Sequence, residues 1–212
     1  KGKLISLTRQ AMINDDLNGF MRIANMMGRA AARTIGNDVY SVLTTNAAMA
    51  DGVAIFHADH SNLAGTGAAP TAATVGAARS AMRLRQDMNA NDYLDIQPDI
   101  ILGPVALEDT LNVLMASETN PANANSKVPN PVRNMAEVVT DPRLDAVSAT
   151  AWYLIANPMD VPLIEVAFLD GNQNPYLESE QGFTIDGIQW KVRLDYGTDS
   201  IDNRGGYKNA GA

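Results

Sequence analysis

The segment NDDLNGFMRIANMMGRAAARTIGNDVYSVLT, residues 14–44, carries the strongest pattern in the sequence. Its apolar residues recur at steps of three and four, the period of a helix with one buried face. They are Leu17, Phe20, Met21, Ala24, Met27, Ala31, Ile35, Val39 and Val42. Asn14, Asp15 and Asp16 suit the start of such a helix because short polar side chains cap its free N–H groups. The segment predicts a helix over residues 16–44, about 40 Å long, with these inward positions buried: Phe20, Met27, Ile35 and Val42.

A second pattern lies near the C-terminus, where apolar and polar residues alternate over residues 188–195. Alternation with a period of two is typical of a half-buried strand. Asp186-Gly187 stands just before it, and this dipeptide favours a two-residue hairpin turn in which the glycine takes a positive φ. The sequence therefore predicts a hairpin over residues 183–195.

The remaining patterns are shorter and mix helices with strands. The expected strands are residues 3–8, 99–102, 136–140, 151–156 and 163–169, and the expected helices are residues 71–90 and 103–117. On the first of these helices, Arg79, Arg83 and Arg85 should point outward. Asp51-Gly52 predicts a further hairpin turn, and the Asn- and Pro-rich residues 118–134 predict a long surface loop. Because no βαβ rhythm is visible, the fold class is α+β.

The amino-acid composition excludes several classes of protein. The 212 residues are 46% hydrophobic but only 6% aromatic, and they include no cysteine. This excludes disulfides, thiolate zinc sites and cysteine nucleophiles. No apolar run is long enough to cross a membrane. The chain starts at Lys1 with no methionine and no signal-peptide pattern, so we interpret it as part of a longer protein.

The net charge of −8 is unevenly distributed. Residues 1–45 carry six Lys and Arg against three Asp, whereas the remainder carries ten Lys and Arg against twenty-one Asp and Glu. An acidic body argues against nucleic-acid binding as the main task, since that task needs a basic face. Opposite charges on two parts of one chain suit head-to-tail contact between copies. They equally suit a basic helix that packs on the acidic remainder of its own chain.

The motif that most suggests chemistry is His57-Ala58-Asp59-His60, which holds both histidines of the chain. Two imidazoles and a carboxylate can share one metal ion, so a metal-dependent hydrolase using His57, Asp59 and His60 is one hypothesis. In a strand, however, His57 and Asp59 lie on one face and His60 on the other, and no further ligand cluster is visible. We interpret the motif as the end of a structural hairpin.

Carboxylate pairs offer no better candidate. Asp15 and Asp16 stand where a helix needs caps, and Glu178 and Glu180 look like solvated loop residues rather than a general acid–base pair. Gly103-Pro104 lacks the glycines and lysine of a phosphate-binding loop. The sequence therefore assigns no catalytic residue, no cofactor-binding residue and no metal ligand, and it predicts no cofactor and no enzyme activity.

Several short phrases, taken in order, resemble one protein family over nearly the whole chain. The phrases are RQAMINDDL at residues 9–17, GVAIFHADHSNL at 52–63, EVAFLDG at 165–171, WKVR at 190–193 and RGGYKN at 204–209. In this order they resemble the tailed-bacteriophage major capsid proteins, also called major head proteins. The similarity is greatest to the Mu-like prophage heads and to heads encoded as a fusion with a prohead protease.

This resemblance implies the Hong-Kong-ninety-seven-like major capsid fold. Residues 1–70 and 161–212 would form a peripheral-type domain that contains a long spine helix. Residues 71–160 would form mainly an axial-type domain. The family's N-terminal arm and extended loop would precede Lys1 and are absent from this chain.

The same resemblance implies a structural subunit of a phage or prophage head, located in the virion capsid. Copies would self-assemble into pentameric and hexameric capsomeres of an icosahedral shell that encloses DNA, in the cytoplasm of a bacterial host. The partners would be other copies, a scaffold or prohead protease, and the portal; packaged DNA would be contacted non-specifically, and no membrane would be involved. The alternatives from other classes are the metal-dependent hydrolase and a monomeric phage tail or binding module.

Overall fold

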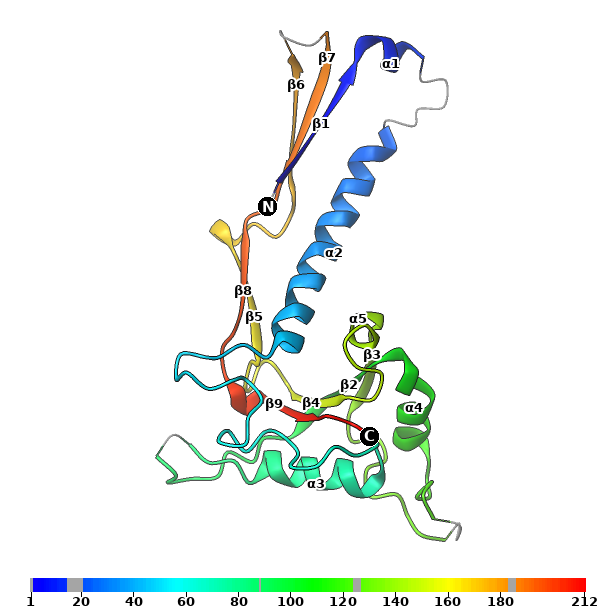
Figure 1. Ribbon diagram of the computed structural model, residues 1–212, viewed down its shortest axis with the longest axis vertical. Helices are drawn as coiled ribbons and strands as arrows, with labels where there is room; N and C mark the ends of the chain where they lie inside the picture. Colours follow the sequence, from blue (N-terminus) through cyan, green and yellow to red (C-terminus); the bar gives the residue numbers. More distant parts are fainter. Residues whose placement is uncertain (1, 15–20, 88, 124–126, 183–185) are drawn as a thin grey trace. The chain divides into compact units, whose positions relative to one another are not determined.

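A computed structural model describes residues 2–14, 21–87, 89–123, 127–182 and 186–212 (Figure 1). Contacts divide the chain into two compact units. Unit 1 comprises Lys1–Val39 and Val166–Asp199, and unit 2 comprises Tyr40–Glu165 and Ser200–Ala212. Both helices and strands are present, as expected for an α+β chain.

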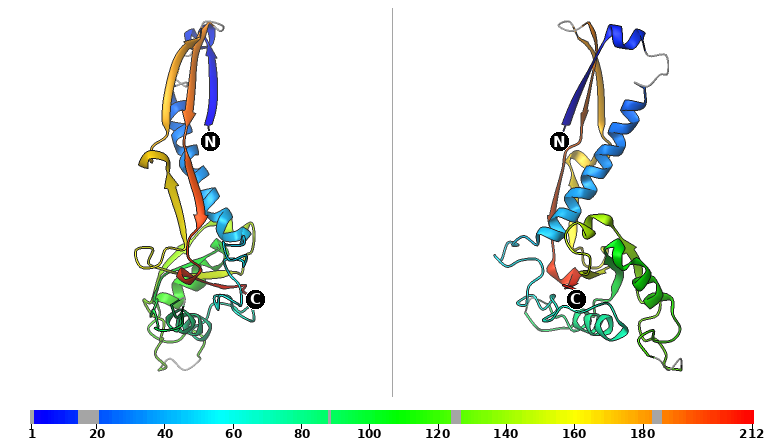
Figure 2. Two further views of the ribbon diagram at one scale, coloured as in Figure 1. Left: turned by 90° about the vertical axis from the view of Figure 1, so that its left-hand side faces the viewer. Right: turned by 45° about the vertical axis from the view of Figure 1, so that its right-hand side comes forward.

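Unit 1 contains a three-stranded antiparallel sheet in the order β1-β7-β6. Its strands are β1 (Gly2–Thr8), β7 (Gly187–Arg193) and β6 (Tyr176–Gly182), which run alongside one another in the views of Figure 2. Ile5, Trp190 and Ser179 stand opposite one another across the three strands and therefore share one face. The predicted strand at residues 3–8 is confirmed, and the strand predicted at 188–195 is confirmed over residues 188–193, whereas Glu178 and Glu180 of β6 were expected in a loop.

The turn prediction at Gly187 is wrong. Gly187 is the first residue of β7 and pairs with both Thr8 and Gly182. Its φ is not positive. Strand β6 ends at Gly182 and β7 begins at Gly187, and residues 183–185 of the predicted hairpin lie outside the described residues. Glycine is required at 187 for a different reason: a Cβ there would overlap the carbonyl oxygen of Leu7 in the neighbouring strand.

The long helix is confirmed as α2 (Met21–Thr45), about 37 Å at 1.5 Å per residue. It follows the short helix α1 (Arg9–Ile13). Of the positions expected to be buried, Met27, Ile35 and Val42 are only half-buried, and Phe20 lies outside the described residues. Among the side chains of α2 that the structure describes, Leu43, in unit 2, is fully buried. The expected full burial of Met27, Ile35 and Val42 is wrong, and Met27 lines a groove that remains open beside α2.

Unit 2 is built around a four-stranded sheet in the order β3-β2-β4-β9. Its strands are β2 (Pro98–Gly103), β3 (Glu137–Thr140), β4 (Trp152–Ala156) and β9 (Gly206–Asn209). Side chains alternate along β4, so that Trp152 and Leu154 enter one hydrophobic cluster and Tyr153 enters a second. Both faces of this sheet are therefore covered. β2 and β3 are parallel neighbours, a pairing that the sequence patterns did not indicate.

The helices of unit 2 are α3 (Ala72–Arg83), α4 (Glu108–Ala116) and the short α5 (Pro142–Asp145). Single turns of 3-10 helix are η1 (Val105–Leu107) and η3 (Asn203–Gly205), and η2 (Leu169–Gly171) belongs to unit 1. Helix α3 ends seven residues before the predicted boundary. The Asp87 side chain accepts hydrogen bonds from the backbone of Asn89 and Asn91, which offers the chain a turn in place of a further helical turn.

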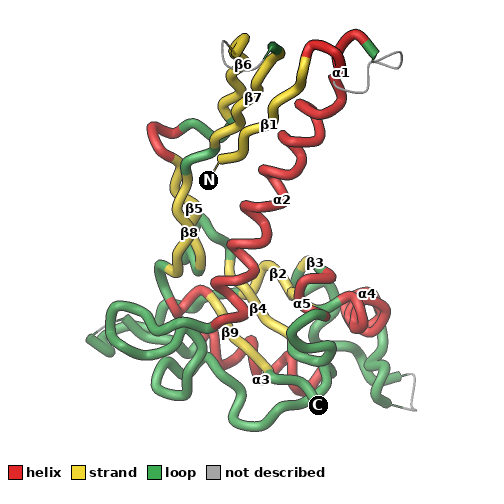
Figure 3. The backbone as a smooth tube through the Cα atoms, turned by 45° about the horizontal axis from the view of Figure 1, so that its top comes forward, coloured by secondary structure: helices red, strands yellow, loops and turns green. Residues whose placement is uncertain are grey.

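Two more strands, β5 (Ile164–Phe168) and β8 (Tyr196–Ser200), pair with each other. The segment between α2 and α3 is almost entirely loop (Figure 3). Gly52 has a positive φ of 80°, as its predicted turn requires, but the flanking residues form only the single bridge Ala48–Ala54. The expected hairpin at this turn is thus reduced to one bridge.

Candidate functional site

The loop after α2 is fastened to the end of the chain by a buried amide, Asn62, which is 0% exposed. Its Nδ2 donates to the carbonyl oxygens of Ile55 (2.6 Å) and Asn203 (3.1 Å), and its Oδ1 accepts from the backbone N–H of His57 (2.8 Å). The backbone N–H of Lys208 in β9 donates to the Asn62 carbonyl oxygen. A buried amide with these partners satisfied orders the loop without exposing any reactive group.

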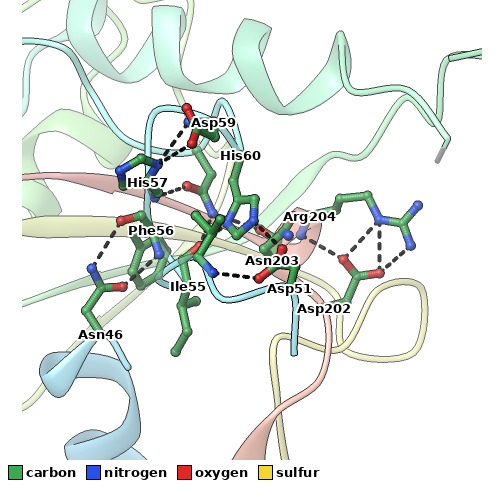
Figure 4. A network of polar contacts seen from close by, with 12 residues as sticks. Asn46, Asp51, Ile55, Phe56, His57, Asp59, His60, Asp202, Asn203 and Arg204 are labelled. Carbon is green, nitrogen blue, oxygen red and sulfur yellow. Dashed lines mark hydrogen bonds and ion pairs between the residues drawn. The ribbon is translucent and has the colours of Figure 1, made fainter. Parts of the chain in front are cut away.

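A second amide holds the same loop from its other end (Figure 4). Asn46, just beyond α2, accepts from the backbone N–H of Phe56 (2.7 Å) and donates to the carbonyl oxygen of Phe56 (3.1 Å). Phe56 is itself buried and packs its ring against Tyr153. The motif that suggested chemistry thus follows a segment fixed by side-chain amides rather than a strand of a hairpin.

The two histidines do not converge on one point. His60 has its Nε2 2.8 Å from Asp51 Oδ2 and its Nδ1 3.2 Å from the carbonyl oxygen of Ile55. His57 Nδ1 accepts from the backbone N–H of Asp59 (3.2 Å). Both ring nitrogens of His60 therefore face oxygen atoms of the protein, whereas a metal ligand needs a free nitrogen lone pair.

The two histidines of the motif therefore pair with two different carboxylates. His57 lies beside Asp59 and His60 beside Asp51. The hydrogen bond from the Val53 backbone and the one with His60 lower the pKa of Asp51. Among the described residues, no group of three or more His, Asp or Glu side chains is placed to hold a metal ion. The arrangement ties a loop together and provides no nucleophile beside a base.

Arg85 departs most from its expected role. The sequence placed it outward on a helix, but α3 ends at Arg83, and Arg85 turns inward and is 6% exposed. Its guanidinium donates to the carbonyl oxygens of Asn203, Arg204 and Gly206. Burial lowers its pKa to about 10. Arg79 is half-buried, and Arg83 remains exposed and pairs with Asp95.

The other residues considered for catalysis are structural or lie outside the described residues. Glu178 and Glu180 belong to the exposed strand β6, not to a loop, and Glu178 pairs with Lys191 at 2.6 Å. Asp15 and Asp16 fall outside the described residues. After Gly103-Pro104, the free N–H groups of η1 donate to the carboxylate of Asp145, which occupies the place that a phosphate would need.

A wide hollow of unit 1 lies between α2 and β1, and we call it the α2 groove. Its volume is about 710 Å³. Its lining combines apolar and cationic side chains: Ile5, Met26, Met27, Ala30 and Ala32, with Lys3, Arg29 and Arg33. A surface of this kind, together with the exposed sheet beside it, is typical of protein contact rather than of catalysis.

Comparison with protein families decides between these possibilities. A family described as phage capsid protein matches residues 1–209, nearly the whole chain. The chain belongs to the phage capsid protein family. Membership indicates a structural subunit of a phage head, found in the virion capsid, and not an enzyme.

Solved structures related to this capsid protein share its fold at low sequence identity. The capsid of cyanophage P-SCSP1u is 12% identical with a TM-score of 0.59, covering 100% of this chain and 72% of that one. A chain of Mycobacterium phage Patience is 9% identical with a TM-score of 0.61, covering 100% and 70%. The SrpI encapsulin of Synechococcus elongatus is 10% identical with a TM-score of 0.55, covering 99% and 72%.

These likenesses give the capsid protein the Hong-Kong-ninety-seven-like fold that phage capsids and encapsulins share. No curated protein sequence matches the chain. None of the helices among the described residues combines the length and apolar character needed to span a membrane. The sequence did not indicate the structural roles of Asn62 and Arg85, because single polar residues reveal their burial only once the fold is known.

Proposed function

We propose that the capsid protein self-associates into pentameric and hexameric capsomeres of an icosahedral shell that encloses DNA. The observation that carries this proposal is the incomplete packing of unit 1. Its strands β1 and β6 are almost wholly exposed, and within the described part of the chain their outer edges have no strand partner. Unpaired strand edges and open apolar surface are stable in a protein when neighbouring copies cover them.

The proposed domain organisation and partners are those of the capsid family. Residues 1–70 and 161–212 form a peripheral-type domain in which α2 is the spine helix, and residues 71–160 form mainly an axial-type domain at the centre of a capsomere. The subunit type is the Mu-like or protease-fused one. Its further partners are a scaffold or prohead protease and the portal, and packaged DNA is contacted without sequence preference. Assembly takes place in the cytoplasm of a bacterial host.

The test is assembly of the intact protein. A precursor containing residues 1–212, expressed with its head-assembly partners, should yield rings of five and six subunits and closed shells in electron microscopy. Light scattering of the purified protein should show species larger than a monomer. A strictly monomeric precursor without rings or particles would contradict the proposal and favour a monomeric tail or binding module.

A further inference from the structure

The α2 groove brings apolar side chains and cationic side chains together in one lining. Met26, which lines it, is 58% exposed, and Arg29 and Arg33 are exposed one helical turn apart. Neither arginine forms an ion pair with another described residue. The occupant that fits this groove therefore carries an apolar side chain next to a carboxylate.

One turn of unit 2 presents that combination. Met159 is 91% exposed, more than any other large apolar residue in the described part of the chain. Asp160 follows it and is also exposed. Asn157 holds the turn: its Oδ1 accepts from the Met159 backbone N–H (2.9 Å), and its carbonyl oxygen accepts from the N–H groups of Asp160 (3.0 Å) and Val161 (3.1 Å). We call residues 157–161 the Met159 turn.

We infer that the α2 groove receives the Met159 turn of a second copy of the chain. Met159 would contact the apolar side chains of the groove, and Asp160 would meet Arg29 and Arg33. The inference rests on the proposed self-association and names the surfaces that make it. Since the groove belongs to unit 1 and the turn to unit 2, the contact joins unlike patches of two copies, which is the kind of contact that closes rings.

The charge of the chain favours a second copy over nucleic acid. Residues 46–212, which include the Met159 turn, carry ten Lys and Arg against twenty-one Asp and Glu, whereas the groove contributes Lys3, Arg29 and Arg33. Phosphates would satisfy the arginines but would leave the apolar side chains of the groove uncovered. The Met159 turn covers both, and its backbone is already ordered by Asn157, so that little freedom is lost on binding.

A cross-link tests the contact directly, because the chain contains no cysteine. Met159→Cys and Ala32→Cys introduced together in the intact protein should give a ladder of disulfide-linked multimers under oxidation, since Ala32 lines the groove. Leu169→Cys with Ala32→Cys is the matched control: Leu169 is 62% exposed on another turn and should give monomers. Equal ladders from the two pairs, or none from the first, would overturn the inference.

Association measurements give the strength of the contact. Met159→Ala should weaken capsomere association about tenfold or more, the loss expected when a buried methionine side chain is removed, whereas Leu169→Ala should not. The double variant Arg29→Glu and Arg33→Glu should weaken association, and adding Asp160→Lys to it should restore part of the loss. Circular dichroism melts confirm that each variant is folded.

The outcomes separate this inference from the function on which it rests. If the unsubstituted protein forms no rings or shells, the proposed function fails, and the inference with it. If it assembles and the Met159 and arginine variants assemble equally well, only the inference is overturned. An arginine variant that assembles normally but loses DNA retention also overturns it and assigns the groove to nucleic acid.

Discussion

Among the described residues, nearly all buried hydrophobic side chains belong to unit 2, and unit 1 contributes only Val192 and Leu194. The sheet of unit 2 has a hydrophobic cluster on each face. The sheet of unit 1 has strands of similar or greater length, yet β6 is exposed along almost its entire length. One unit is therefore stabilised by its own packing and the other mainly by its backbone hydrogen bonds and short-range side-chain contacts.

This difference suits a subunit that completes its packing by assembly. A well-packed unit keeps its shape in the free chain, and an open unit can bury its surfaces against neighbours without first breaking internal contacts. Regions with few buried apolar contacts open with low free energy. We therefore expect hydrogen exchange to be slow in β2 and β4 and fast in β6 before assembly, and slow in both units afterwards.

The largest expected effect is the difference in stability lost when each of the two tryptophans of the chain is replaced by alanine. Trp152 is 0% exposed in unit 2, and its Nε1 donates to the carbonyl oxygen of Ala68 (2.9 Å). Trp152→Ala should lower the free energy of unfolding by about 3–5 kcal/mol because it leaves a cavity. Trp190→Ala in unit 1 should cost roughly 1–2 kcal/mol, since Trp190 is only half-buried. Urea unfolding followed by circular dichroism measures both, and equal losses would show that unit 1 is packed as well as unit 2.

The next effect tests whether backbone pairing holds unit 1 together. Gly187→Val should cost about 1–3 kcal/mol, because the new side chain would overlap the backbone of Leu7 and separate β1 from β7. Gly197→Val is the matched control, since a Cβ there meets no atom within 4 Å. Hydrogen exchange of the β1 amides should rise in the first variant alone. Unchanged protection in Gly187→Val would mean that the sheet tolerates displacement of its first strand.

The periodic parts of this fold could be predicted from the sequence, and the parts set by tertiary contact could not. Apolar repeats of 3.6 and 2 residues predict helix α2 and strand β7, respectively. Strand β6 lacks such a pattern: both of its faces are exposed, so nothing selects apolar residues at alternate positions. The predicted turn at Gly187 is wrong because a glycine that avoids a clash and a glycine at positive φ look the same in sequence.

The site was predictable to a similar extent. The phrases of residues 52–63 and 204–209 pointed to the capsid family, and the structure joins these two segments through Asn62 and Lys208. What could not be predicted is which polar residues would be buried there. In the sequence, Arg85 cannot be distinguished from an exposed arginine. In the structure it follows the end of α3, and its guanidinium donates to the carbonyl oxygens of Asn203 and Gly206.

A smaller effect is expected for a charge placed at Ile35, a half-buried position of α2 in unit 1. Because Ile35 is half-buried, the carboxylate of Ile35→Asp can remain hydrated, and the variant should fold with a loss of about 1–2 kcal/mol rather than fail to fold. Leu43→Asp, on the same helix but 3% exposed in unit 2, should abolish soluble expression. Thermal melts of the soluble fraction measure the contrast. Failure of both variants would show that the α2 face in unit 1 is sealed in the free chain.

The smallest effect is electrostatic and belongs to unit 1. The hydrogen bond with Lys191 and its charge lower the pKa of Glu178 from its ordinary value of 4.5. A carboxylate whose pKa is depressed by folding stabilises the fold above its ordinary value, and this contribution disappears as the pH falls through the lowered value. Glu178→Gln should therefore melt slightly below the unsubstituted protein at pH 7, and the two should converge in acid. Both side chains of the pair are about half exposed, so the difference is small and should shrink with added salt.

Glu180→Gln is the control, because Glu180 lies on the same face but opposite Gln189 instead of a lysine. A pH-independent difference between Glu178→Gln and the unsubstituted protein would show that the side chain acts by its shape on strand β6, and not by its charge.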